Sequence, residues 1–290
     1  MLARSISLLT AISAAAFGFW SSAQACEVRP GALKTTTTVY DPFAASGLHA
    51  QAEMALDLID GKACDVTVRL LDGRLQPIEQ IAVGGPNPAL FTVETPGAFT
   101  PDTLVLHLDP ARPHATVVWT FKPGQDAVLH PGRYDVPLAV GIRPDTATSD
   151  TYVYGTFTVS VPARAQVNIA GASGRFGSSH ASAIDFGQLT TGAHRRAFVQ
   201  IRANTGVFAQ ISSKNHGVLR NEAWPDASPI SYSLVLNGIP INLNLKATES
   251  LDPPATIDGL SLPMDITIGS VEGKFAGTYS DVITIEVSPR

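Results

Sequence analysis

Apolar and polar residues alternate along many short segments of the chain. In the last of these segments, Ile283, Ile285 and Val287 are each followed by a polar residue. A period of two is typical of a β-strand with one buried face. Breakers such as Gly84-Gly85-Pro86 and Pro123-Gly124 separate the segments in the first half of the chain. Short strands at this spacing predict antiparallel β-sandwiches.

In the first half of the chain we predict seven strands. One of them contains good helix formers, but its apolar residues occupy every second position from Ala52 to Leu58, which favours a strand. Trp119 lies inside an alternating segment and is predicted to be buried. The seven segments are Thr35–Tyr40, Gln51–Ile59, Asp65–Leu71, Leu104–Leu108, Thr116–Phe121, Val136–Ile142 and Tyr152–Val161.

In the second half we predict eight strands. Asn237-Gly238, between two apolar runs, is the two-residue signal of a type I′ hairpin. The segments are Gln166–Ala170, Ala183–Phe186, Ala197–Ala203, Val207–Ser212, Ile230–Leu236, Ile239–Leu245, Met264–Ile268 and Thr278–Val287.

One strand pattern occurs twice. Gly132-x-Tyr134 near the middle of the chain matches Gly277-x-Tyr279 near its end, and the apolar positions that follow keep the same parity in both copies. Tyr134 and Tyr279 are therefore predicted to form tyrosine corners, in which the hydroxyl bonds to the backbone across the connection. The first copy is followed by another alternating strand, whereas the second is the last strand of the chain. We therefore expect the second sandwich to lack one strand.

A missing strand predicts a hydrophobic groove. A closing strand with four or five buried aliphatic side chains contributes about 6 to 15 kcal/mol, comparable to the whole stability of a domain. Strand addition from another polypeptide is one remedy. The alternative is that a segment of this chain, such as Gln166–Ala170, closes the edge itself. The predicted groove residues are Val167, Ile169, Ile283, Ile285 and Val287.

Composition supports a folded protein of about two domains. The 290 residues are 44% hydrophobic and 16% charged, and the net charge of −5 argues against a nucleic-acid partner. The fold class predicted is all-β, with two Ig-like antiparallel sandwiches. The predicted boundaries are a signal peptide at 1–25, a first sandwich at 26–161, a linker at 162–165 and a second sandwich at 166–290.

The N-terminus predicts export. Arg4, an apolar stretch and Ala23-Gln24-Ala25 form the three parts of a secretory signal peptide. No segment has the length and flanks of a transmembrane helix. Cys26 and Cys64 are the only cysteines, so a disulfide between them is expected in an oxidising compartment. The alternative is a lipid anchor on Cys26, which Gln24 disfavours.

Three residues in the loop-rich stretch from Ile81 to Phe99 are open to two interpretations. Leu90, Phe91 and Phe99 lie among glycines and prolines. They either cap the end of the sandwich core or form an exposed apolar patch that binds a surface or a partner.

Motifs of enzymes are missing from the sequence. There is no phosphate loop, no nucleophile elbow and no zinc signature. His107-x-Asp109, with His114 and His130, is the one group that resembles a metal or acid–base cluster, and such strand and loop histidines are usually solvated. Asp281 is interpreted as a turn residue. We therefore expect no catalytic residue, metal or cofactor.

Three motifs of the second half resemble a known family. The ending Gly-Thr-Tyr-Ser-Asp-x-Ile-Thr-Ile-x-Val (277–287), Ile184-Asp185-Phe186-Gly187 and Tyr232-Ser233-Leu234 are similar to the spore coat protein U domain, which includes the pilins of archaic chaperone-usher pili. The resemblance covers roughly the last 125 residues. In the first half it is weaker and rests on Tyr40-Asp41-Pro42-Phe43, the two cysteines and the Gly-x-Tyr strand.

The resemblance implies a function as a pilus subunit at the cell surface. The implied partners are a periplasmic chaperone, an outer-membrane usher and a neighbouring pilin that donates a strand. The extra first sandwich and an N-terminus tied by Cys26 suggest the tip adhesin, provided that residues 27–39 are not a free donor strand. The alternatives are a non-pilus envelope or coat protein, and a carbohydrate-binding module.

Overall fold

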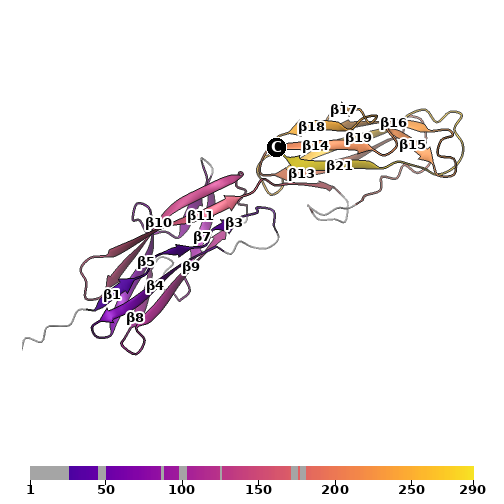
Figure 1. Cartoon of the computed structure of the whole chain (residues 1–290). Helices are drawn as coiled ribbons and strands as arrows, with labels where there is room; N and C mark the ends of the chain where they lie inside the picture. The colour runs from indigo at the N-terminus through magenta and orange to yellow at the C-terminus, as the bar shows by residue number, and fades with distance from the viewer. Residues whose placement is uncertain are drawn as a thin grey trace, which may run out of the picture.

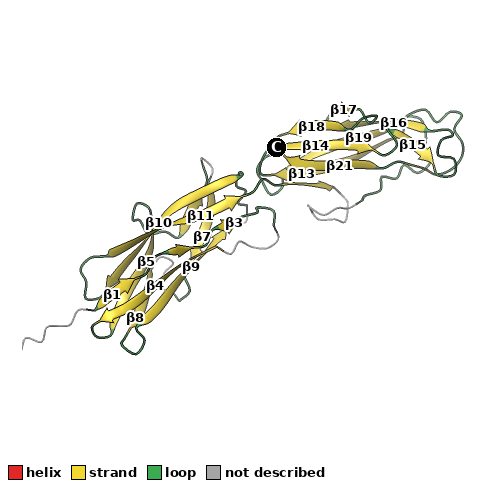
Figure 2. Ribbon diagram, viewed as in Figure 1, coloured by secondary structure: helices red, strands yellow, loops and turns green. Residues whose placement is uncertain are grey.

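The computed structural model describes residues 26–44, 50–85, 88–97, 103–124, 126–170, 176 and 181–290. Within these residues the chain consists of strands and loops, so the predicted all-β fold is confirmed (Figure 2). The strands build two elongated units, each around its own hydrophobic core (Figure 1). We call residues 26–161 the first unit and residues 165–290 the second unit. The predicted signal peptide lies outside the described residues.

The first unit is a sandwich of two sheets, whose strands pair antiparallel except for β3 with β11. One has the order β1-β4-β9-β7-β6 with β2 added on β4, and the other has the order β3-β11-β10-β5-β8. Its strands are β1 (Glu27–Pro30), β2 (Lys34–Thr35), β3 (Thr38–Val39), β4 (Ala50–Asp60), β5 (Cys64–Asp72), β6 (Gln80–Val83), β7 (Ala89–Glu94), β8 (Thr103–Leu108), β9 (His114–Pro123), β10 (Gly132–Pro144) and β11 (Thr151–Val161).

Alternation along these strands fills the first core. In β4, side chains alternate between buried and exposed from Ala50 to Leu56, so the strand interpretation of this segment is confirmed. Trp119 is buried, as predicted. The rings of Phe121 and Phe157, from opposite sheets, pack with centroids 4.4 Å apart.

The segment predicted as one strand over Thr35–Tyr40 forms two short strands in different sheets. β2 pairs with β4, whereas β3 pairs in parallel with β11. The chain therefore crosses from one sheet to the other at the edge of the sandwich. Leu33 fills the space opposite Gly155 of β11, where an added Cβ would lie 2.8 Å from its Cδ2 atom.

The stretch predicted as loop-rich, Ile81–Phe99, contains the hairpin of β6 and β7. Gly84 and Gly85 follow β6, Pro96 and Gly97 follow β7, and the residues of both strands alternate between buried and exposed. Phe91 points inward and is fully buried, so an exposed patch that includes it is wrong. Leu90 points outward and is 48% exposed. Phe99 lies outside the described residues.

The second unit is also a sandwich. One sheet has the order β12-β13-β19-β16-β15-β20 with β17 added on β16, and the other has the order β18-β14-β21. Its strands are β12 (Ala165–Ile169), β13 (His194–Ala203), β14 (Val207–Ser213), β15 (Val218–Asn221), β16 (Ile230–Leu236), β17 (Ile239–Ile241), β18 (Ala247–Leu251), β19 (Leu260–Ile268), β20 (Tyr279–Ser280) and β21 (Ile283–Pro289).

The predicted hairpin between β16 and β17 is confirmed. Asn237 and Gly238 have φ values of 49° and 80°, the positive pair that a type I′ turn requires. The predicted extension of this strand to Leu245 is wrong. After Ile241 the side chain of Asn242 accepts a hydrogen bond from the backbone of Asn244, which turns the chain away.

Ala183–Phe186 was also predicted as a strand and is unpaired. Ile184 and Phe186 still pack against the second core. The alternation in this segment therefore reflects two side chains that cover the core, with no sheet partner for the backbone.

The predicted disulfide between Cys26 and Cys64 is confirmed, with the two Cα atoms 6.2 Å apart. It ties the start of β1 to the start of β5, in the opposite sheet.

Candidate strand-acceptor site

Two edge strands of the second unit have an unpaired side. β21 pairs with β14 only, and β12 pairs with β13 only, among the residues that the structure describes. Cα atoms of β12 and β21 approach within 8 Å of each other, but no backbone hydrogen bond joins the two strands. We call this boundary between the two sheets the seam.

The five residues predicted to border a groove all lie along this seam. Each is partly buried and packs against the second core. In β21 they alternate with exposed polar residues, and in β12 every side chain is half-buried. These five residues are Val167 and Ile169 from β12, and Ile283, Ile285 and Val287 from β21.

The seam is narrower than the predicted groove. A strand inserted between two others separates them by two strand spacings, about 9.5 Å. The approach of β12 to β21 within 8 Å is less than this. The two apolar edges lie close enough to shield each other partly from water. Insertion of a strand would require β12 and β21 to move apart.

The alternative that Gln166–Ala170 closes the edge of the last strand is wrong. β12 forms a five-residue ladder with β13, from Ala165 opposite Ala203 to Ile169 opposite Val199. The hydrogen bonds of β12 therefore extend the sheet that contains β13, and within the described part of the chain the second edge of β21 stays unpaired.

Asp281 fixes the start of β21. One carboxylate oxygen accepts hydrogen bonds from the hydroxyls of Ser213 and Tyr232, each at 2.6 Å. The other accepts from the backbone N–H groups of Asn215 at 3.0 Å and Val282 at 2.7 Å. Burial, followed by the hydrogen bond to Asp281, raises the pKa of Tyr232 above its ordinary value. Asp281 is thus a structural turn residue, in agreement with its interpretation from sequence.

Both predicted tyrosine corners have the expected hydrogen bond. The hydroxyl of Tyr134 donates to the carbonyl of His130, and that of Tyr279 donates to the carbonyl of Phe275, each over 2.9 Å. Each bond spans four residues and lies at the start of a strand, β10 in the first unit and the short strand β20, which precedes β21, in the second.

A polar joint connects the two units beside one end of the seam. Asn204 is fully buried. Its side chain accepts a hydrogen bond from the backbone of Arg164 at 2.7 Å and donates to the carbonyls of Leu129 at 3.0 Å and Pro162 at 2.9 Å. Its own carbonyl is 3.0 Å from Nδ1 of His130. One asparagine of the second unit therefore satisfies backbone groups of the first unit and of the connection between the units.

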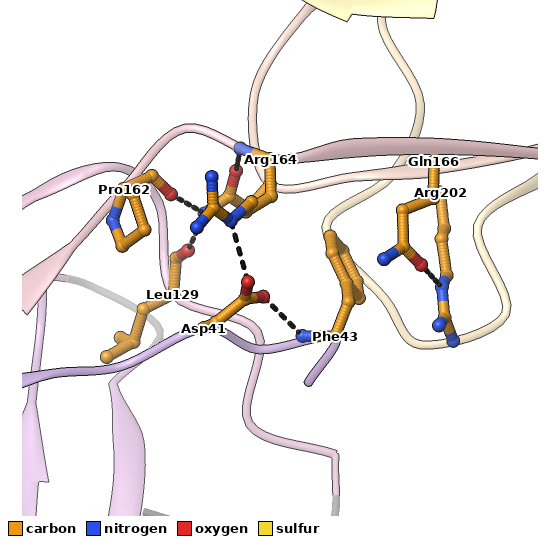
Figure 3. Close-up of polar contacts among 8 residues, drawn as sticks. Asp41, Phe43, Leu129, Pro162, Arg164, Gln166 and Arg202 are labelled. Atoms are coloured by element: carbon orange, nitrogen blue, oxygen red, sulfur yellow. Dashed lines mark hydrogen bonds and ion pairs between the residues drawn. The ribbon is translucent and has the colours of Figure 1, made fainter. Parts of the chain in front are cut away.

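Charged and aromatic contacts of Asp41, Arg164 and Arg202 also belong to the joint (Figure 3). The guanidinium of Arg164 donates to Asp41 over 2.6 Å, and the same carboxylate accepts from the backbone of Phe43. The Arg202 guanidinium lies 5.0 Å from the centre of the Phe43 ring and donates to Gln166. These contacts link the segment after β3 to the strands β12 and β13.

Sequence reasoning missed the joint. Asn204 follows the alternating strand β13 and precedes Gly206, so the local pattern predicts only a turn. The amide bonds to Leu129 of the first unit, 75 residues away in sequence, and local periodicity does not register a contact at this distance along the chain.

Residues 27–39 are built into the first unit. β1 and β2 pair with β4, and β3 pairs with β11. This segment is therefore not the free donor strand that would have argued against a tip position.

The histidines considered as a cluster are dispersed. His107 contacts Asp65, His114 contacts Asp57, Asp109 pairs with Arg112, and His130 is at the joint. Within the described ranges no three His, Cys, Asp or Glu side chains are placed to hold one metal ion. None of the described residues forms a helix of the length and apolarity that crossing a membrane requires.

No protein-family model and no curated protein matches the chain. The resemblance to the spore coat protein U domain therefore rests on its motifs alone.

Solved structures that match the chain include pilus subunits and their complexes with chaperones. The CsuC–CsuE chaperone–tip adhesion subunit complex from archaic Csu pili of Acinetobacter baumannii is 11% identical, with 88% of this chain and 99% of that chain covered and a TM-score of 0.49. A chaperone–tip adhesin complex of CFA/I fimbriae is 11% identical, covers 91% of each chain and has a TM-score of 0.38. Self-complemented MyfA of Yersinia enterocolitica is 14% identical, covers 46% of this chain and 98% of its own, and has a TM-score of 0.31. All three TM-scores are below 0.5, so these matches carry no assignment of function.

Proposed function

We propose that the chain is an exported subunit of a chaperone-usher pilus, whose second unit is completed by a strand from another polypeptide. The observation that carries this proposal is the seam, where the free edges of β12 and β21 face each other across five half-buried aliphatic side chains. Unpaired, apolar strand edges promote pairing with another chain. A donated strand between them would join the two sheets and bury these side chains.

The partners follow from this requirement. In the periplasm a chaperone would supply the strand, and during passage through the outer-membrane usher a strand of the neighbouring subunit would replace it. The two sandwiches, the signal peptide predicted from the sequence and the disulfide suit a protein that functions at the cell surface.

Periplasmic expression with and without a pilus chaperone from the same organism tests the proposal. Alone, the chain should aggregate or be degraded, and with the chaperone it should be recovered as a soluble complex. Ile285→Glu, which places a charge in the seam, should abolish the complex. Leu245→Glu in the same unit is a matched control, because Leu245 is 69% exposed and the substitution should leave the complex intact.

A stable, protease-resistant monomer without the chaperone would contradict the proposal. The same holds for a complex that Ile285→Glu leaves unchanged.

Within the pilus, we assign the subunit to the tip. The first unit has its own closing strands, and residues 27–39 are consumed by its sheets. A subunit that accepts a strand and has no free strand in this segment suits the end of a fibre, with the first unit presented to the target. An epitope tag on the subunit should label one end of each fibre in electron microscopy. Labelling along the shaft would exclude the tip position.

A further inference from the structure

The end of the second unit that lies away from the first unit carries three exposed apolar side chains. Trp224 is 63% exposed, and Phe275 and Val282 are each 55% exposed. They belong to the loop between β15 and β16, the loop between β19 and β20, and the residue before β21. Figure 1 places these loops, beside the β15 label, at the end of the second unit farthest from the first. We call these three residues the distal pole.

The loop of Trp224 is held in place by Asn221, which is 1% exposed. The side-chain oxygen of Asn221 accepts hydrogen bonds from the backbone of Ala223 at 2.9 Å and Trp224 at 3.2 Å. Its amide donates to the carbonyl of Ala276 in the other loop at 3.4 Å. The approach requires Gly277, because a Cβ there would lie 2.7 Å from the Asn221 amide nitrogen.

The loop of Phe275 is fixed to the loop of Trp224. The backbone of Phe275 donates to the hydroxyl of Ser228 at 3.0 Å, and its carbonyl accepts from Tyr279. Lys274 Nζ reaches the carbonyl of Pro229 at 2.5 Å. The two loops therefore form one hydrogen-bonded structure.

Rigid loops that expose a tryptophan and a phenylalanine are typical of a binding surface. Tryptophan is enriched among the residues that carry most of the energy of protein interfaces. A preformed backbone reduces the entropy lost on association. Trp224 and Phe275 contribute little to the second core, since more than half of each side chain faces solvent.

The direction of β21 indicates which polypeptide lies beside the distal pole. β21 runs from Ile283, at the distal pole, to Pro289, at the joint. All but one of the described strand pairs are antiparallel, and a donated strand that pairs antiparallel with β21 runs from the joint to the pole. Its chain then leaves the seam beside Val282. The opposite end of the seam lies beside the first unit, which is joined there through Asn204.

We propose that Trp224, Phe275 and Val282 contact the folded body of the pilus subunit that donates its N-terminal strand. This inference rests on the proposed function and adds a second interface to it. The donated strand fills the seam, and the pole packs against the domain that follows the strand. The pole thereby fixes the angle between the two subunits at the end of the fibre.

Photo-crosslinking in cells that assemble the fibre tests this contact. With p-benzoyl-L-phenylalanine in place of Trp224 or Phe275, illumination should give a covalent adduct with the neighbouring subunit. The same probe in place of Phe208 should give none, because Phe208 is an exposed aromatic residue at the joint end of the unit. No adduct, or an adduct with the chaperone alone, would overturn the proposal.

Substitutions separate this interface from the seam. The variant Trp224→Ser with Phe275→Ser should form the chaperone complex at the wild-type yield, but its recovery in sheared fibres should fall about tenfold or more. Phe208→Ser should leave both unchanged. Normal recovery of the double variant in fibres would refute the pole interface and leave the proposed function standing. Loss of the chaperone complex in the double variant would also refute it, since the pole would then support folding. If the wild-type chain enters no fibre, the proposed function and this inference both fail.

Discussion

The side-chain amide of Asn204 in the second unit donates a 3.0 Å hydrogen bond to the backbone carbonyl of Leu129 in the first. The same side chain bonds to Arg164 and Pro162 of the connection. Asn204 and the residue of the Leu129 carbonyl are both buried, so water would not easily replace this hydrogen bond. Together with the Arg164–Asp41 ion pair and the Arg202–Phe43 contact, Asn204 therefore helps to set the orientation of the two units.

Asn204→Ala should destabilise the chain by about 2 to 4 kcal/mol, since the buried carbonyl of Leu129 and the part-buried backbone groups of Pro162 and Arg164 lose their partner. It should also loosen the joint, which small-angle X-ray scattering of the chaperone-bound protein would detect as a wider distribution of distances between the units. Asn244→Ala is the control, because Asn244 is exposed and the change should be within about 0.5 kcal/mol. An unchanged scattering profile for Asn204→Ala would contradict the role of the joint.

The tyrosine corners give a matched pair of substitutions. Tyr134→Phe and Tyr279→Phe each remove one hydroxyl that donates over 2.9 Å to a carbonyl four residues upstream. Each should lower the free energy of unfolding of its own unit by about 0.5 to 1.5 kcal/mol. Calorimetry that resolves the two transitions would measure this.

The control for both corners is Tyr154→Phe, since the side chain of Tyr154 is 65% exposed. If Tyr134→Phe or Tyr279→Phe shifts the unfolding temperatures of both units equally, or of neither, the hydroxyl has no local role.

Alternation predicted most of the strands because side chains on sandwich strands have two distinct environments. It succeeded for β4, where helix formers such as Ala52 and Met54 occupy inward positions. It also located the seam, since Val167, Ile169, Ile283, Ile285 and Val287 all lie where the pattern put them. The hairpin at Asn237-Gly238 was predictable because its positive φ values suit few other residue pairs.

The failures have two physical causes. The glycines and prolines near Phe91 predict a loop, but Phe91 lies in a six-residue strand. Its side chain and those of its neighbours alternate between buried and exposed. Ala183–Phe186 alternates without pairing, because Ile184 and Phe186 cover the core from a loop. The joint at Asn204 was not predictable, since a buried polar residue is recognised only from its tertiary partners.

Packing at the edge of the first sandwich predicts a coupled pair of substitutions. Leu33 occupies the space that a side chain at Gly155 would need, with its Cδ2 atom 2.8 Å from the position of an added Cβ. Gly155→Ala should destabilise the first unit by about 1 to 3 kcal/mol through overpacking. Leu33→Ala makes room for the methyl group, so the double variant should be more stable than the sum of the two single effects predicts. Denaturant unfolding followed by the fluorescence of buried Trp119 measures all three variants, and strictly additive effects would exclude the coupling.

Tyr40 predicts a pH dependence of the first unit. Its hydroxyl is buried and donates to the carbonyl of Ala127. Burial, together with the negative charge of Asp41, raises the pKa of Tyr40 to about 12. In the unfolded chain a tyrosine ionises near pH 10. Between about pH 10 and 12 the unfolded state therefore loses a proton that the folded state keeps, and stability falls as the pH rises.

Tyr40→Phe should remove this dependence. At pH 8 the variant should be less stable than the wild type by about 0.5 to 1.5 kcal/mol, because the hydrogen bond to Ala127 is lost. From about pH 10 to pH 12 the difference should shrink, since only the wild type loses stability through this hydroxyl. The difference in the free energy of unfolding can be measured at several pH values by Trp119 fluorescence. Tyr154→Phe is the exposed control. A difference that stays constant from pH 8 to pH 12 would show that the burial of the Tyr40 hydroxyl does not control the alkaline stability of the first unit.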